Sequence, residues 1–180
     1  MTCIVGLVHK GRVWMGGDSA GVDEAGLSLV QRVDKKVFVN GPFLFGFTSS
    51  FRMGQLLAYA FKPPLCGDGE DVMDFMVRDF INGVRDCLNS GGFSKIEDNV
   101  ETGGGFLVGY DGRLFHVEDD YQVGESLHGY DACGCGEGPA LGSLFSSQKE
   151  QDPRKRIHMA LSAAETFSGG VRAPFHVIGQ

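Results

Sequence analysis

Runs of apolar residues bounded by turn residues predict strands along most of the chain. Gly41 and Pro42 separate two such runs and predict a hairpin between them. Asp111 and Gly112 separate another two, and these residue types supply the positive φ angles of a tight hairpin turn. Residues 20–32 show a weaker pattern and are expected to form a looser connection. The predicted strand regions are residues 3–9, 13–17, 36–41, 43–50, 104–119 and 174–180.

Apolar residues at helical spacing predict two pairs of helices between these strands. The first helix begins near Ser50 or Phe51 and stops before Pro63, because proline cannot continue a helix. The second runs from Glu70 to about Asn89. A Gly-rich loop at residues 133–142 leads into the third helix, and the fourth buries one face over residues 157–164.

The order of elements is strands, two helices, strands, two helices and a strand. Strands that are apolar on both faces require a covering layer on each side. We therefore expect an α+β fold, a four-layer αββα sandwich in which two antiparallel sheets are flanked by helix pairs. No linker, repeat or low-complexity segment divides the chain, so residues 1–180 are expected to form a single domain.

Composition narrows the classes of partner. No apolar run approaches the length that crosses a bilayer, and no secretory leader is readable, so we expect a cytoplasmic protein without membrane contact. The net charge of −7, with scattered Lys and Arg, disfavours nucleic acid as a partner. Cys133 and Cys135 lack the spacing of a redox pair and a second pair of ligands. We expect free thiols in a reducing compartment, no metal and no cofactor.

The first strand begins unusually close to the start of the chain. Thr2 precedes the apolar run directly, and a small second residue permits removal of Met1. Thr2 would then carry a hydroxyl and a free α-amine, and an α-amine with a pKa of about 7.7 to 8.0 can accept a proton near neutrality. One residue would thus supply both nucleophile and general base. Processing beyond Thr2 would instead make Cys3 the N-terminal nucleophile.

Several motifs then fall in the order found in one family. The stretch from Thr2 to "GGDSAG" resembles the start of the N-terminal-nucleophile (Ntn) hydrolases of the proteasome β-subunit and HslV type, with Asp18 at the family's aspartate. In "RVDKKVF", Lys36 falls at the catalytic lysine, after a slightly longer loop. "FLFGFTSS" is similar to the strand that enters the oxyanion-hole turn, with Ser49 and Ser50 where glycines are usual.

The resemblance continues to the C-terminal part of the chain. "CGCGEGPALG" is similar to a Gly-rich segment of the family, with Cys135 where a serine of the catalytic site is usual. "ETFSGG" is similar to the element that ends the penultimate helix, and it places Glu165 and Ser168 at a supporting Asp and Ser. Glu165 is one methylene longer than the family's residue.

The resemblance implies a role for each residue that physical chemistry supports. Lys36 would lower the pKa of the Thr2 hydroxyl and amine through its charge, and Asp18 would pair with Lys36. A backbone N–H at Ser49 or Ser50 would stabilise an oxyanion. Ser168 would hydrogen-bond the α-amine. Taken singly, each residue has an ordinary reading as a turn former or solvated charge; their co-occurrence in order favours the family.

Three functions remain open. The first is a threonine-type peptidase that cleaves polypeptides inside a homo-oligomeric ring, with an ATPase unfoldase as a possible partner. The second is an Ntn amidase that acts on a small substrate with the same nucleophile. The third is a catalytically silent, structural member of a proteasome-like assembly. Retention of Asp18, Lys36 and Ser168 argues against the silent member, because a structural shell does not need those groups.

Overall fold

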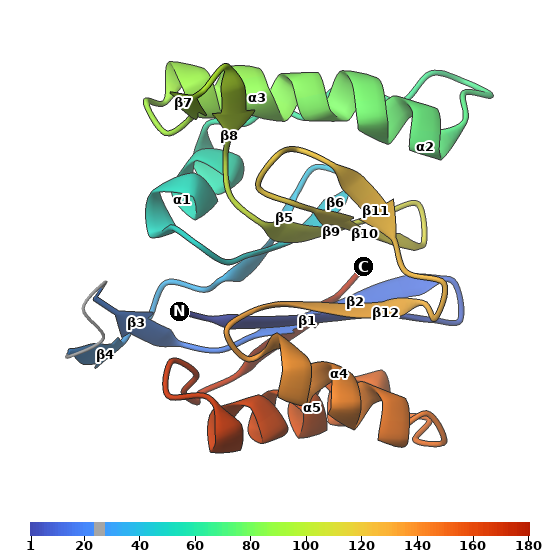
Figure 1. Ribbon diagram of the computed structural model, residues 1–180. Helices are drawn as coiled ribbons and strands as arrows, with labels where there is room; N and C mark the ends of the chain where they lie inside the picture. Colours follow the sequence, from blue (N-terminus) through green and yellow to red (C-terminus); the bar gives the residue numbers. More distant parts are fainter. Residues whose placement is uncertain (24–27) are drawn as a thin grey trace.

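Two antiparallel β-sheets lie face to face in the middle of the structure, and helices cover the outer face of each (Figure 1). The computed structural model describes residues 1–23 and 28–180. Three hydrophobic clusters correspond to the three interfaces between the four layers. The α+β four-layer sandwich predicted from the sequence is therefore confirmed.

The first sheet has β1 as one of its two inner strands. Each strand pairs antiparallel with its neighbours, and β1 and β2 are joined by a two-residue turn in which Lys10 and Gly11 both have positive φ. Since β1 is paired on both sides, the residue that precedes it is held at the end of the sheet. The order of strands is β12 (Tyr130–Gly134), β1 (Cys3–His9), β2 (Arg12–Gly17) and β13 (His176–Gly179).

The second sheet carries the other two predicted hairpins. Asp111 and Gly112, with φ of 49° and 70°, form the turn between β9 and β10. The β6 strand is buried along its whole length because it packs against helices on one face and the first sheet on the other. The order is β11 (Val123–Glu125), β10 (Arg113–Val117), β9 (Phe106–Tyr110), β6 (Phe43–Phe47) and β5 (Val37–Asn40).

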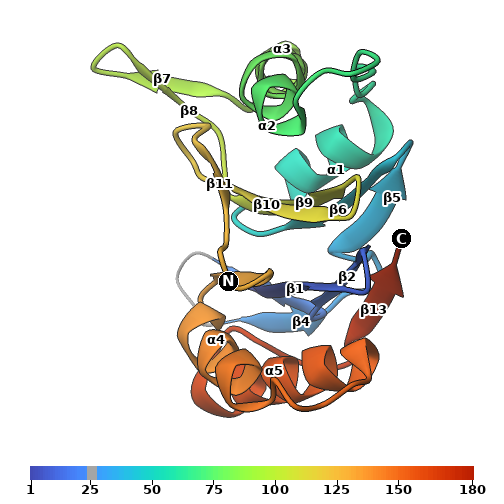
Figure 2. The same cartoon turned by 90° about the vertical axis from the view of Figure 1, so that its right-hand side faces the viewer.

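Helices form the two outer layers, as Figure 2 shows from the side. The predicted long helix over residues 70–89 is present as three consecutive segments with a π-helical part in the middle. Ser50 caps the first helix by accepting a hydrogen bond from Arg52 N–H. On the second sheet lie α1 (Phe51–Tyr59), α2 (Val72–Phe75), η1 (Met76–Phe80) and α3 (Ile81–Ser90); on the first lie α4 (Glu137–Ser146) and α5 (Pro153–Phe167).

The sequence pattern did not predict several short strands. The looser connection at residues 20–32 contains a hairpin, and its tip at residues 24–27 lies outside the described residues. All three residues of β4 are exposed, so no buried face marks that strand. The loop expected at residues 133–142 is shorter than predicted, because residues 133–134 end β12 and α4 begins at Glu137. The unpredicted strands besides β11 and β12 are β3 (Ala20–Val22), β4 (Leu29–Gln31), β7 (Lys95–Glu97) and β8 (Val100–Thr102).

Phenylalanine rings dominate the interface between the second sheet and its helices. Phe43 packs within 5.0 Å of Phe80, centroid to centroid, and Phe45 lies edge-on to Phe61 at 6.2 Å. The interface between the two sheets is built from smaller aliphatic side chains such as Ile4. Within the described residues, no helix is both long and apolar enough to cross a membrane.

Because α5 packs closely on the first sheet, one methyl group added between them should destabilise the fold markedly. A Cβ at Gly16 would lie 2.3 Å from Ile157 Cγ2, so Gly16→Ala must displace a buried side chain. We expect the free energy of unfolding in urea to fall by about 1–3 kcal/mol. Gly142→Ala is the matched control, since open space surrounds that helical, exposed position and alanine favours a helix. Equal stability of the two variants would contradict the packing described here.

Candidate functional site

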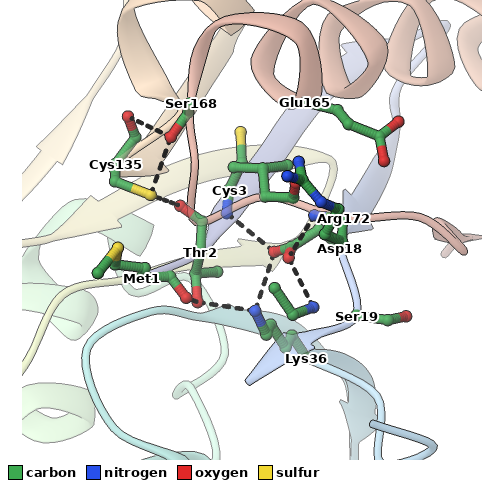
Figure 3. A network of polar contacts seen from close by, with 12 residues as sticks. Met1, Thr2, Cys3, Asp18, Ser19, Lys36, Cys135, Glu165, Ser168 and Arg172 are labelled. Carbon is green, nitrogen blue, oxygen red and sulfur yellow. Dashed lines mark hydrogen bonds and ion pairs between the residues drawn. The ribbon is translucent and has the colours of Figure 1, made fainter. Parts of the chain in front are cut away.

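Thr2 lies buried at the N-terminal end of β1, with only 4% of its surface exposed. Its hydroxyl is 2.9 Å from Lys36 Nζ, which donates to it, and it donates in turn to the carbonyl oxygen of Met1 (Figure 3). The Thr2 carbonyl accepts a hydrogen bond from Gly136 N–H in the turn after β12. The side chain of Thr2 is therefore fixed beside a buried cation.

Lys36 stands immediately before β5 and forms a completely buried ion pair. Its Nζ lies 2.9 Å from Asp18 Oδ1, and neither side chain is exposed. Burial lowers the pKa of Lys36, and the charge and hydrogen bond of Asp18 oppose that shift. Lys35, its neighbour in sequence, is exposed. The two adjacent lysines thus have opposite environments.

Asp18 follows β2 and accepts four hydrogen bonds through its two oxygens. Oδ1 accepts from Lys36 Nζ and from Cys3 N–H at 3.0 Å. Oδ2 accepts from Ala20 N–H at 2.8 Å and from Arg172 N–H at 3.3 Å. Four donors hold the carboxylate in one orientation and offset part of the cost of burying it.

Ser168 and Cys135 lie on the other side of Thr2 (Figure 3). Ser168 Oγ, at the end of α5, donates toward the carbonyl oxygen and the thiol of Cys135, at 3.3 and 3.2 Å. The Cys135 thiol donates in turn to the Thr2 carbonyl at 3.4 Å. The structure therefore joins Ser168 to Thr2 through the thiol of Cys135.

Glu165 makes its hydrogen bond away from Thr2. Its Oε1 accepts a hydrogen bond from Ala173 N–H at 2.9 Å, and it touches none of Thr2, Asp18 or Lys36 among the contacts described. The glutamate side chain, which is one methylene longer than an aspartate, reaches the connection between α5 and β13.

The turn after β6 supplies the candidate oxyanion donors. Ser49 has a φ of 65°, and Ser50 N–H is already bonded to Thr48 O at 2.8 Å. Among the residues described, Ser49 N–H has no hydrogen-bond partner, and Ser49 lines the same small cleft as Thr2. Of the two serines, Ser49 is therefore the better placed donor.

Met1 lines the same small cleft as Thr2. A Cβ at Gly170 would lie 2.3 Å from Met1 Cβ and 3.0 Å from the Cys135 sulfur, so the side chain of Met1 packs on the Gly170 backbone. With Met1 attached, the nitrogen of Thr2 is an amide without basicity. Removal of Met1 would free this nitrogen in a residue whose carbonyl oxygen contacts Cys135.

Two neighbours of Asp18 were not predicted from the sequence. Arg172 and Ala20 each contribute a backbone N–H, and the residue type does not reveal a backbone donor.

The thiol of Cys3 is poorly suited to act as a nucleophile, because burial, followed by the charge of Asp18, raises its pKa to about 12. In the described part of the chain, no group of His, Cys, Asp and Glu has the arrangement of a metal site.

Several solved structures have a similar fold. The chain is similar to Thiobacillus denitrificans BPH in complex with epoxomicin, with a TM-score of 0.78 and 18% identity over 99% of this chain and 98% of that one. It is similar to HslV from Trypanosoma brucei, with a TM-score of 0.68 and 14% identity over 99% and 98% of the two chains. Anbu (ancestral β-subunit) from Yersinia bercovieri gives 0.65 and 13%, over 99% and 81%.

No protein-family model and no curated protein sequence matches the chain. The likeness is therefore one of structure, and it extends over almost all residues. The chain has the fold of the proteasome-β-like Ntn hydrolases.

Proposed function

We propose that the protein is a threonine-type peptidase whose nucleophile is the hydroxyl of Thr2 after Met1 has been removed. The observation that carries this proposal is the buried Asp18–Lys36 pair with Lys36 Nζ 2.9 Å from Thr2 Oγ1. A surface lysine needs no such arrangement. A buried cation against a hydroxyl favours the alkoxide form and so activates a weak nucleophile.

In the proposed reaction Thr2 Oγ1 attacks the carbonyl carbon of a peptide bond, and its proton passes to the free α-amine of Thr2. Ser49 N–H donates to the oxyanion that forms. The intermediate collapses as the C–N bond breaks, and the α-amine returns the proton to the leaving amine. An ester on Thr2 remains, and water activated by the same amine hydrolyses it. Ser168 and Cys135 orient the residue that performs both roles.

The proposed substrate is a polypeptide, and the proposed setting is a homo-oligomeric ring in the cytoplasm, with an ATPase unfoldase as a possible partner. Support for this setting comes from the folds it shares with HslV and with Anbu, which is described as an ancestral β-subunit. A small-substrate amidase would use the same nucleophile. Cleavage of unfolded polypeptide by the assembled protein separates the two.

Removal of Met1 should be required for activity. A chain with a non-removable N-terminal extension keeps the Thr2 nitrogen as an amide, so it should neither cleave peptides nor react with epoxomicin, the molecule bound to BPH. The processed chain should do both, with the adduct detected by intact mass. Peptide cleavage by the extended chain at the rate of the processed chain would overturn the mechanism.

Lys36→Met should lower kcat by about 10²- to 10³-fold, the size expected for loss of one preorganised charge. Methionine keeps most of the length of the stem but cannot stabilise the Thr2 alkoxide. Lys35→Met is the matched control, because Lys35 is exposed and should leave the rate nearly unchanged. Equal losses in the two variants would show that the wrong lysine has been assigned.

Variants of the first residues separate the two candidate nucleophiles. Thr2→Ala should abolish turnover and leave the far-ultraviolet circular dichroism unchanged, while Thr2→Ser should keep reduced activity since the hydroxyl survives. Cys3→Ala should have little effect on rate, because the raised pKa of its thiol keeps it protonated. An inactive Cys3→Ala together with an active Thr2→Ala would move the nucleophile to Cys3.

A further inference from the structure

The connection between α5 and β13 passes through the candidate site, and its backbone is held at every polar group from Arg172 to Pro174. Arg172 N–H donates to Asp18, and Ser19 N–H donates to Arg172 O at 2.9 Å. The Ser19 hydroxyl donates to Pro174 O at 2.5 Å. This stretch, residues 172–174, is called the brace below.

Two side chains from distant parts of the chain hold the middle residue of the brace. Glu165, in the last turn of α5, accepts from Ala173 N–H at 2.9 Å. Gln31, at the end of β4, donates through Nε2 to Ala173 O at 2.6 Å. The N–H and the carbonyl oxygen of Ala173 are thus both hydrogen-bonded, by two side chains that lie 134 residues apart in sequence (165 − 31).

The brace matters because its first residue donates to the carboxylate that pairs with Lys36. Asp18 Oδ2 has two donors, Ala20 N–H and Arg172 N–H, and the latter is the longer at 3.3 Å. Displacement of Arg172 would leave Oδ2 with Ala20 N–H as its one donor and the carboxylate with three of its four hydrogen bonds. The carboxylate would then be held less firmly against Lys36 Nζ.

We propose that Gln31 and Glu165 are positioning residues, which act through Ala173 and Arg172 to hold the Asp18 carboxylate against Lys36. This inference rests on the proposed function. It gives Glu165 a role that differs from direct support of the nucleophile, and it gives a role to Gln31, which no sequence motif marked. Neither residue hydrogen-bonds to Thr2; the contact of each with the brace is at Ala173.

The experiment compares processed wild type with Gln31→Met and Glu165→Met on a fluorogenic peptide across pH. Both variants keep side-chain length and lose the bond to Ala173. We expect kcat to fall about 3- to 10-fold with KM nearly constant, the range for one hydrogen bond. Since Asp18 raises the pKa of Lys36, weaker pairing lets that pKa fall, and the alkaline limb of the kcat profile should move to lower pH. A purely structural role would not move this limb.

Two further variants complete the design. Glu165→Gln keeps an accepting oxygen and should recover much of the rate lost in Glu165→Met. Gln122→Met is the matched control for Gln31, since Gln122 is exposed in the loop between β10 and β11 and should change neither rate nor profile. If the enzyme is active and the alkaline limb is unshifted in both Gln31→Met and Glu165→Met, the positioning role of these two residues is wrong. The proposed function would be unaffected by that result.

A measurement without turnover keeps the inference separate from the proposed function. Amide hydrogen exchange at Arg172 should speed up in Gln31→Met and Glu165→Met and stay slow in Gln122→Met. If processed wild type shows no turnover, the proposed function fails, and exchange still decides whether Gln31 and Glu165 hold the brace. Unchanged exchange at Arg172 in both variants would overturn it.

Discussion

The buried pair of Asp18 and Lys36 is the interaction on which the rest of the candidate site depends. Removing two charges from water costs several kcal/mol per ion, and their mutual attraction repays this only with good geometry and additional hydrogen bonds. Asp18 has those bonds, three of them from backbone N–H groups. Replacement by apolar side chains of similar volume is often neutral or stabilising for a buried pair. A pair kept here, against a threonine hydroxyl, is better explained by chemistry than by stability.

The fold provides the rigidity that this pair requires. Thr2 is held because β1 is paired on both sides in the first sheet, and Lys36 is held because β5 begins at the next residue. Asp18 follows β2 directly, so three strand ends place three functional groups within hydrogen-bond distance. Loops alone would leave these side chains free to reach solvent, and the ion pair would lose its low-dielectric surroundings.

Prediction from the sequence succeeded where residue type carries the signal. Asp111 and Gly112 predicted a hairpin turn because these residue types adopt the positive φ angles that the turn requires. The long amphipathic helices were predicted from the periodicity of their apolar residues. Thr2, Asp18 and Lys36 were expected together because their order resembles that of a family, and the structure brings them together. The β12 strand and the Arg172 contact were not predicted. The former is a five-residue strand without a long apolar run, and the latter is a backbone group whose residue type is immaterial.

The two sides of Thr2 differ in burial and in the kind of hydrogen bond that holds them. The Asp18–Lys36 side is buried and held by charge-assisted bonds of 2.9 to 3.0 Å. The Cys135–Ser168 side is more exposed, and its sulfur contacts are 3.2 and 3.4 Å long. A thiol is a weak donor, so this side orients Thr2 less tightly. The position of the Thr2 hydroxyl is therefore set mainly by the buried Asp18–Lys36 pair, and through Arg172 by the brace.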